Sequence, residues 1–157
     1  MIIKTIDEDI FKTKMNHITF AINKEGINDS GFARKVSEDY WPELRYCGQN
    51  ELGNVISKTI NGKTFHALVC HSLDQGWGCN QRRIIEKCFN NIDTDEQIAS
   101  VAIGNGFVGF LSGADIKQIL CGMYDSDKEI VLYSGFTLDD VITCYNEENG
   151  YTKKLTI

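Results

Sequence analysis

Two glycine-containing segments of the sequence have the composition of loops that bind phosphate or sugar groups. The first covers residues 23–33 and includes Asn23, Asp29 and Gly31, and the second covers residues 103–113 and contains four glycines. Glycine permits positive φ angles and lets a ligand approach backbone N–H groups, which bind anions well when a helix begins just after them. Each segment alone also fits a tight turn without a ligand, so both interpretations stay open.

Two further polar residues lie next to expected strands or turns. The amide of Asn23 follows a buried-looking strand, where it could hold a sugar hydroxyl or a water, but an Asx-type turn would use the same atoms. Asp9 could accept a hydrogen bond from an exocyclic amine, or cap the turn formed by residues 10–12. Each side chain therefore has one ligand-binding and one turn-forming interpretation.

The three histidines lie at different positions relative to the expected strands. His71 ends an expected strand, and it reaches the ligand edge of the sheet if that strand is parallel to its neighbours. An imidazole there could act as a general base. His17 and His66 fall within strand patterns and are expected to pack or to lie at the surface.

Strands and helices alternate along the chain, which predicts an α/β fold with a largely parallel or mixed sheet. Strands are expected at residues 2–6, 17–22, 55–60, 63–69, 98–103 and 129–134, with the pair 55–60 and 63–69 joined by an Asn61-Gly62 hairpin turn. Helices are expected from about residue 32 to before Pro42, over residues 80–92, after the second glycine segment and after the Thr137-x-x-Asp140 capping box. Ligands of such folds bind beyond the carboxyl ends of the strands, and both glycine segments belong on that edge.

Composition narrows the possible functions. The chain has 157 residues, with 16 Lys and Arg against 22 Asp and Glu and a formal net charge of −6, which argues against non-specific duplex nucleic-acid binding. One domain over residues 1–145, followed by a polar tail over residues 146–157, is expected. The glycines within the uncharged stretch 97–114 argue against a membrane helix, and the N-terminus lacks a signal-peptide pattern, so a cytoplasmic location is expected.

The six cysteines include no C-x-x-C pair, which argues against a structural zinc site and against thioredoxin-like chemistry. Cys70, Cys88 and Cys121 are expected to be small buried apolar residues. No metal site and no cofactor is indicated.

Several motifs, taken in order, resemble those of macrodomains. Residues 23–33, followed by a helix and Tyr40-Trp41-Pro42, resemble the family's first ligand loop, most closely in the branch of the DNA ADP-ribosylation antitoxin and the terminal ADP-ribose glycohydrolase. Residues 99–110 look like its phosphate-cradling loop, and Ile6-x-x-Asp9-Ile10 resembles an early motif whose Asp contacts adenine. The likeness extends from about residue 2 to residue 134.

The resemblance implies a three-layer α/β/α sandwich with a mixed central sheet, and ADP-ribose, an NAD-derived nucleotide or an ADP-ribosylated macromolecule as its ligand. It implies substrate-binding roles for Asp9, Ile10, Gly31, Phe32, Ala33, Gly104, Asn105, Gly106, Phe107, Val108, Gly109 and Phe110. Asn23, Asp29 and His71 are the candidate catalytic residues if an ADP-ribosyl linkage is hydrolysed.

The chain departs from the family pattern at three positions that bear on catalysis. Phe20 occupies the place of an earlier Asn, His71 falls near the place of a Lys that acts in the glycohydrolase branch, and Val108 replaces an Asp. A covalent Lys and Asp mechanism is therefore not supported. A non-catalytic reader of ADP-ribosylated partners, or a protein that sequesters an ADP-ribose-derived signal in bacterial or phage conflict, is the alternative, and a redox role for the cysteines ranks third.

Overall fold

The computed structural model describes residues 1–74, 80–103 and 114–150 of the chain. Within them the strands are β1 (Ile2–Ile6), β2 (His17–Asn23), β3 (Val55–Ile60), β4 (Lys63–His71), β5 (Ile98–Val101) and β6 (Ile130–Tyr133). The helices are α1 (Gly31–Asp39), α2 (Gln81–Asn90), α3 (Ala114–Asp125) and α4 (Leu138–Glu148), and two short 3-10 helices are η1 (Ile10–Lys12) and η2 (Pro42–Arg45). Strands and helices alternate through most of this order.

The strands form one sheet in the order β1-β6-β5-β2-β4-β3. All neighbouring pairs are parallel except β3 with β4, which form the hairpin. Asn61 and Gly62 both have positive φ, at 51° and 81°, as the expected type I′ turn requires. The five parallel strands end on the same edge of the sheet, and the loops that follow them meet there.

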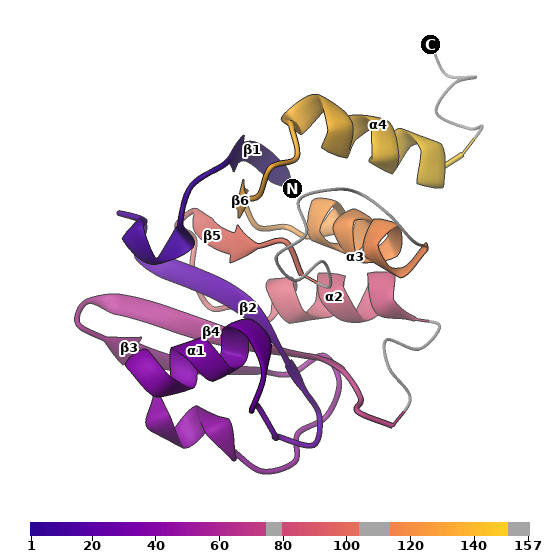
Figure 1. The fold of residues 1–157 in the computed structure, drawn as a ribbon. Helices are drawn as coiled ribbons and strands as arrows, with labels where there is room; N and C mark the ends of the chain where they lie inside the picture. The colour runs from indigo at the N-terminus through magenta and orange to yellow at the C-terminus, as the bar shows by residue number, and fades with distance from the viewer. Residues whose placement is uncertain (75–79, 104–113, 151–157) are drawn as a thin grey trace.

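Helices cover both faces of the sheet, as the ribbon in Figure 1 shows. One face packs against α1 and the two 3-10 helices through a cluster that includes Phe20, Val36, Leu44 and Phe65. The other packs against α2, α3 and α4 through a larger cluster. The structure is therefore a three-layer α/β/α sandwich with a mixed sheet, and the predicted fold class is confirmed.

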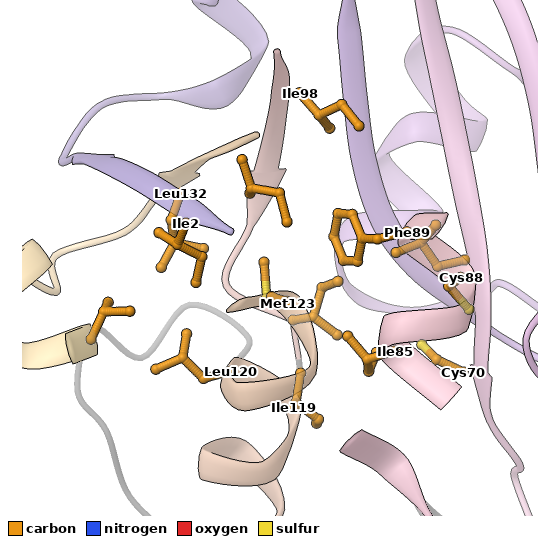
Figure 2. Packing of buried hydrophobic residues seen from close by; sticks show 14 of the residues in the cluster. Ile2, Cys70, Ile85, Cys88, Phe89, Ile98, Ile119, Leu120, Met123 and Leu132 are labelled. Carbon is orange, nitrogen blue, oxygen red and sulfur yellow. The ribbon is translucent and has the colours of Figure 1, made fainter. Parts of the chain in front are cut away.

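The larger core cluster joins α2 and α3 to the sheet (Figure 2). Ile85 and Phe89 of α2 and Ile119 of α3 are at most 1% exposed, and they meet strand residues such as Ile98 and Leu132. The apolar face of α2 is the stripe that its helical spacing predicts. Cys70, Cys88 and Cys121 are also at most 1% exposed, so their predicted burial is confirmed.

Most expected elements form within a few residues of their predicted bounds, and the differences lie at their ends. The strand expected over residues 98–103 ends at Val101, while Ile103 stays 3% exposed. Thr137 and Asp140 form the predicted reciprocal capping box of α4. This helix continues to Glu148, three residues past the expected end of the domain, and the Glu148 carboxylate accepts a hydrogen bond from Gln118 at 2.8 Å. Residues 151–157 of the expected tail lie outside the described residues.

In the three described ranges, no helix has both the length and the apolar character that crossing a membrane requires.

Candidate functional site

A cleft of about 1020 Å³ opens at the carboxyl ends of the parallel strands. The ends of β2, β4 and β5 form part of its lining, together with the loops that follow β1, β2, β4 and β6. Pockets for small ligands commonly measure about 300–1,000 Å³, so this cleft has room for a dinucleotide-sized molecule. Its position at the carboxyl edge is where ligands of open α/β sheets bind.

The cleft brings together the predicted site residues that the structure describes. Its lining includes Asp9, Ile10, Asn23, Asp29, Gly31, Phe32, Ala33 and His71. The predicted phosphate-loop residues Gly104, Asn105, Gly106, Phe107, Val108, Gly109 and Phe110 lie outside the described residues. Ile103, the last described residue before that loop, lines the cleft. The chain therefore enters the predicted phosphate loop from the cleft wall.

Asn23 closes the loop that follows β2. Its Oδ1 accepts a hydrogen bond from the N–H of Ile27 at 3.1 Å, and its Nδ2 donates to the carbonyl of Ile27 at 2.6 Å. The residue is 6% exposed. Because both amide atoms already bind the main chain, the geometry favours the turn-forming interpretation, in which Asn23 shapes the wall of the cleft.

Gly26 and Gly31 make this loop sterically possible. Gly26 has φ +74° and lies so close to the backbone of Gly48 that a Cβ atom would clash with it. Gly31, with φ +63°, is the first residue of α1. A positive φ at both positions strongly favours glycine over any other residue.

The N-terminus of α1 faces the cleft without a side-chain cap. Ser30 is the N-cap residue, but its hydroxyl makes no capping hydrogen bond. Ser30, Gly31 and Phe32 all line the cleft, so the first backbone N–H groups of α1 are available to an anionic or sugar ligand there. Asp29, directly before the cap, is exposed at the same place.

Asp9 caps η1 and also lines the cleft. Its Oδ1 accepts a hydrogen bond from the N–H of Phe11 at 3.0 Å, which is the turn-forming alternative for this residue. A carboxylate has two oxygens and about four lone-pair sites, so the cap leaves acceptor capacity for a ligand amine. Ile10 beside it is 5% exposed and anchors η1 to the core.

His71 ends β4, which is parallel to β2, so the condition for its place on the ligand edge is met. Its carbonyl accepts a hydrogen bond from the N–H of Lys24 at 2.8 Å. Burial lowers the pKa of the His71 imidazole, and the charge of Glu25 partly opposes this shift. The ring is therefore neutral at pH 7 and able to accept a proton.

Glu25 joins the two loops at this end of the cleft, and the sequence analysis missed it. Its carboxylate accepts hydrogen bonds from the hydroxyl of Ser72 and the N–H of Leu73, each at 2.9 Å. The Leu73 amide is the main cause that lowers the pKa of Glu25. These partners lie 47 and 48 residues further along the chain, so no local pattern could have identified the contact.

An aromatic wall lines the cleft beside α1, and of its two rings Phe32 was a predicted site residue while Phe11 was missed. The rings of Phe11 and Phe32 stack with their centroids 4.8 Å apart, and the Lys35 ammonium lies 5.3 Å from the centroid of Phe11. The only sequence signal for Phe11 was its place next to Asp9 and Ile10. This wall gives the cleft an apolar part of its lining beside the polar loop residues.

The described lining carries more acidic than basic residues. Asp7, Glu8, Asp9 and Asp29 contribute carboxylates, and Lys35 contributes the one ammonium among the described lining residues. A phosphorylated ligand would therefore depend mainly on backbone N–H groups for its binding. Within residues 1–74, 80–103 and 114–150, no three His, Cys, Asp or Glu side chains are grouped to hold a metal ion.

No protein-family model and no curated protein matches the chain, but solved structures share its fold. The macrodomain of Thermus aquaticus DarG aligns over 83% of this chain and 97% of its own, with a TM-score of 0.58 and 13% identity. A Bacteroides thetaiotaomicron protein of unknown function aligns over 83% and 96%, with a TM-score of 0.55 and 14% identity. The alphavirus P23pro-zbd structure aligns over 98% of this chain, with a TM-score of 0.60 and 14% identity, and this chain spans 24% of its length. The fold is macrodomain-like, as the sequence motifs predicted.

Proposed function

We propose that the chain binds ADP-ribose, or a related NAD-derived nucleotide, in the cleft at the carboxyl edge of the sheet. The observation that carries this proposal is the uncapped N-terminus of α1, which opens into a cleft of dinucleotide size. Backbone N–H groups at such a helix end bind phosphate or ribose oxygens without help from Lys or Arg. The macrodomain-like fold supports the same ligand class.

The family resemblance supplies the orientation of the ligand. Asp9 accepts from the adenine amine, and the backbone of residues 104–110 holds the diphosphate. The turn formed by Gly31, Phe32 and Ala33 contacts the distal ribose. The acceptor capacity that Asp9 keeps after capping η1 and the position of α1 are consistent with this orientation.

Hydrolysis of an ADP-ribosyl linkage is the finer form of the proposal. A water would attack the anomeric carbon of the distal ribose, with Asp29 or His71 taking its proton. The lowered pKa of His71 keeps its imidazole neutral at pH 7, which is the protonation state that a base needs.

A non-catalytic reader or sequestering protein is the second candidate, and the departures from the family pattern at His71 and Val108 favour it. Each amide atom of Asn23 already makes one hydrogen bond to Ile27, which leaves one N–H and the second lone pair of Oδ1 for a water. The binding step is common to both candidates.

Titration calorimetry with ADP-ribose and with AMP tests the binding step. ADP-ribose is expected to bind more tightly than AMP and to stabilise the folded chain by about 2.7 kcal/mol at a free concentration 100 times Kd. Folded protein that shows no heat of binding and no thermal shift at millimolar ADP-ribose would contradict the proposal.

Product assays on O-linked, N-linked and nucleic-acid-linked ADP-ribosyl substrates separate hydrolase from reader. In a hydrolase, Asp29→Ala or His71→Ala lowers turnover by about 10²–10⁴ while ADP-ribose still binds. Tight binding of ADP-ribose with no release of ADP-ribose from any of these substrates would support the non-catalytic reader.

A further inference from the structure

A row of hydrogen-bonded side chains crosses the sheet at the end opposite the cleft. Ser57 Oγ of β3 lies 2.6 Å from His66 Nδ1 of β4. His66 Nε2 lies 2.9 Å from His17 Nδ1 of β2, and His17 Nε2 lies 3.1 Å from the Glu96 carboxylate. His17 and Asn23 are the two ends of β2, so this row and the cleft are separated by about 20 Å of strand.

The carboxylate at one end determines the direction of every hydrogen bond in the row. Glu96 can only accept, so with neutral imidazoles His17 Nε2 carries a proton, which it shares between the Glu96 carboxylate and the Thr94 hydroxyl 3.2 Å away, and His17 Nδ1 is an acceptor. His66 Nε2 then donates to His17, which leaves His66 Nδ1 as an acceptor. Ser57 must donate its hydroxyl proton to His66, and the lone pairs of Oγ are not used in that bond.

Burial differs along the row: the imidazole beside Ser57 is buried, and Ser57 itself is exposed. His66 is 4% exposed, and the His17 side chain is 12% exposed, whereas Ser57 is an exposed residue of the sheet. Burial, followed by the effect of His17, lowers the pKa of His66 to about 4, so its ring is neutral at physiological pH. The base is held in place inside the protein, and the hydroxyl is accessible from solvent.

We propose that Ser57 is an activated nucleophile that accepts acyl or phosphonyl groups from small electrophiles, with His66 as its base and with His17 and Glu96 orienting that base. The arrangement of a hydroxyl, a base and an orienting group within hydrogen-bond distance is the one that activates serine in acyl transfer. The electrophile class is a small activated ester or a fluorophosphonate that reaches Ser57 directly from solvent.

The transfer balances in atoms and charge. Ser57 Oγ attacks the ester carbonyl carbon, the proton of Oγ moves to His66 Nδ1, and the bond to the leaving oxygen breaks. The leaving group takes that proton and departs as an alcohol or phenol, leaving O-acyl-Ser57. With a fluorophosphonate, Oγ attacks phosphorus, fluoride leaves, and the proton is released to solvent through His66.

Thr59 provides a matched control on the same strand. It lies two residues from Ser57, on the same side of β3, and is also exposed. Its hydroxyl pairs with the Thr64 hydroxyl at 2.9 Å instead of with a histidine. Thr59→Ser therefore adds a second serine that shares the strand and the exposure but has no base.

The experiment treats the full chain carrying Thr59→Ser with a fluorophosphonate and measures labelling at both positions by peptide mass spectrometry. Position 57 is expected to react at least about 10²-fold faster than position 59, in line with the usual contribution of a general base. Equal labelling of the two positions, or none at Ser57 in folded protein, would overturn the proposal.

Two further variants test the role of the row. His66→Gln is expected to slow labelling of Ser57 by about 10²-fold or more. Glu96→Gln changes a carboxylate whose side chain is 58% exposed, so the fold is retained even if His66→Gln is unstable. Because Gln has no charge and can present a donor N–H to His17 as well as an acceptor oxygen, the change removes the group that can only accept, and slower labelling of Ser57 and slower release of p-nitrophenol from p-nitrophenyl acetate are expected. An unchanged labelling rate in folded Glu96→Gln contradicts the assigned role of the row.

Discussion

The two ends of the sheet use polar side chains in opposite ways. At the carboxyl end, Asn23 binds the backbone of its own loop and Glu25 binds the backbone of the loop after β4, and this holds the loops around a cleft of about 1020 Å³. At the other end, His17 and His66 bind each other and the side chains beside them. Side chains that bind loop backbone build a cavity for a ligand, whereas side chains that bind one another form a hydrogen-bonded network around the buried His66, whose protonation matters.

The largest effect is expected at the cleft end, from Gly109→Glu. A carboxylate in the predicted phosphate loop would occupy and repel the diphosphate, so ADP-ribose affinity should fall by about 10²-fold or more. Calorimetry measures the loss. Gly62→Ala, in the hairpin turn at the other end of the sheet, serves as the control. Because Gly62 has a positive φ of 81°, this substitution should lower the stability of the fold, and it should leave ADP-ribose affinity unaltered. Unchanged affinity in folded Gly109→Glu would show that the loop is only a turn.

The second largest effect is expected at the end of the sheet opposite the cleft, where the free energy of unfolding should depend on pH. Burial lowers the pKa of His66 from 6.5 to about 4, so unfolding takes up a proton between these values and the folded state loses stability as pH falls below 6.5. The slope is about 1.4 kcal/mol per pH unit, which gives a loss of about 2 kcal/mol between pH 6.5 and pH 5.

Urea unfolding of wild type and His66→Gln measures this contribution. Burial also lowers the pKa of His71, which adds its own slope in both proteins, so the difference between the two proteins isolates His66. Equal slopes would mean that His66 does not titrate as inferred.

Asn23→Ala is expected to have a smaller effect that combines stability and binding. It removes both hydrogen bonds to Ile27, but Ile27 is 40% exposed and can bind water instead, so unfolding should become easier by only about 1 kcal/mol. ADP-ribose should bind more weakly because the loop is less ordered. Asn23→Asp keeps the acceptor for the Ile27 N–H, and it should retain more of the stability. If Asn23→Ala abolishes turnover while stability and affinity stay normal, its role is catalytic.

The smallest effect is expected for Glu25→Gln. Loss of the charge should weaken the bonds to Ser72 and Leu73 and lower ADP-ribose affinity a few-fold, while AMP affinity stays unchanged. The pKa of His71, measured by NMR, should fall, because the Glu25 carboxylate raises it in the wild type. An unchanged His71 pKa would contradict the electrostatic effect of the Glu25 carboxylate on this histidine.

Local sequence patterns predicted the elements of this fold well where short-range physics decides them. The Asn61-Gly62 turn, the apolar stripe of α2 and the capping box of Thr137 and Asp140 each depend on residues within a few positions of one another. The predicted end of β5 was less accurate, because packing decides where this strand stops. The predicted end at α4 was less accurate, because the contact between Gln118 and Glu148 decides where this helix stops.

The candidate site was predicted in part for the same reason. Asp9, Asn23 and His71 follow or begin recognisable elements, so their place on one edge could be inferred. The sequence could not show whether Asn23 and Asp9 bind a ligand or stabilise a turn. That choice depends on where the backbone amides of Ile27 and Phe11 lie.

The sequence by itself determined the alternation of strands and helices and the edge on which the loops of the cleft gather, because both follow from periodicity and from the geometry of parallel strands. Only the tertiary structure decided that Glu25 binds residues 47 and 48 positions away, and that His66 meets His17. These contacts depend on strand register and on the order of strands in the sheet, which no local spacing encodes.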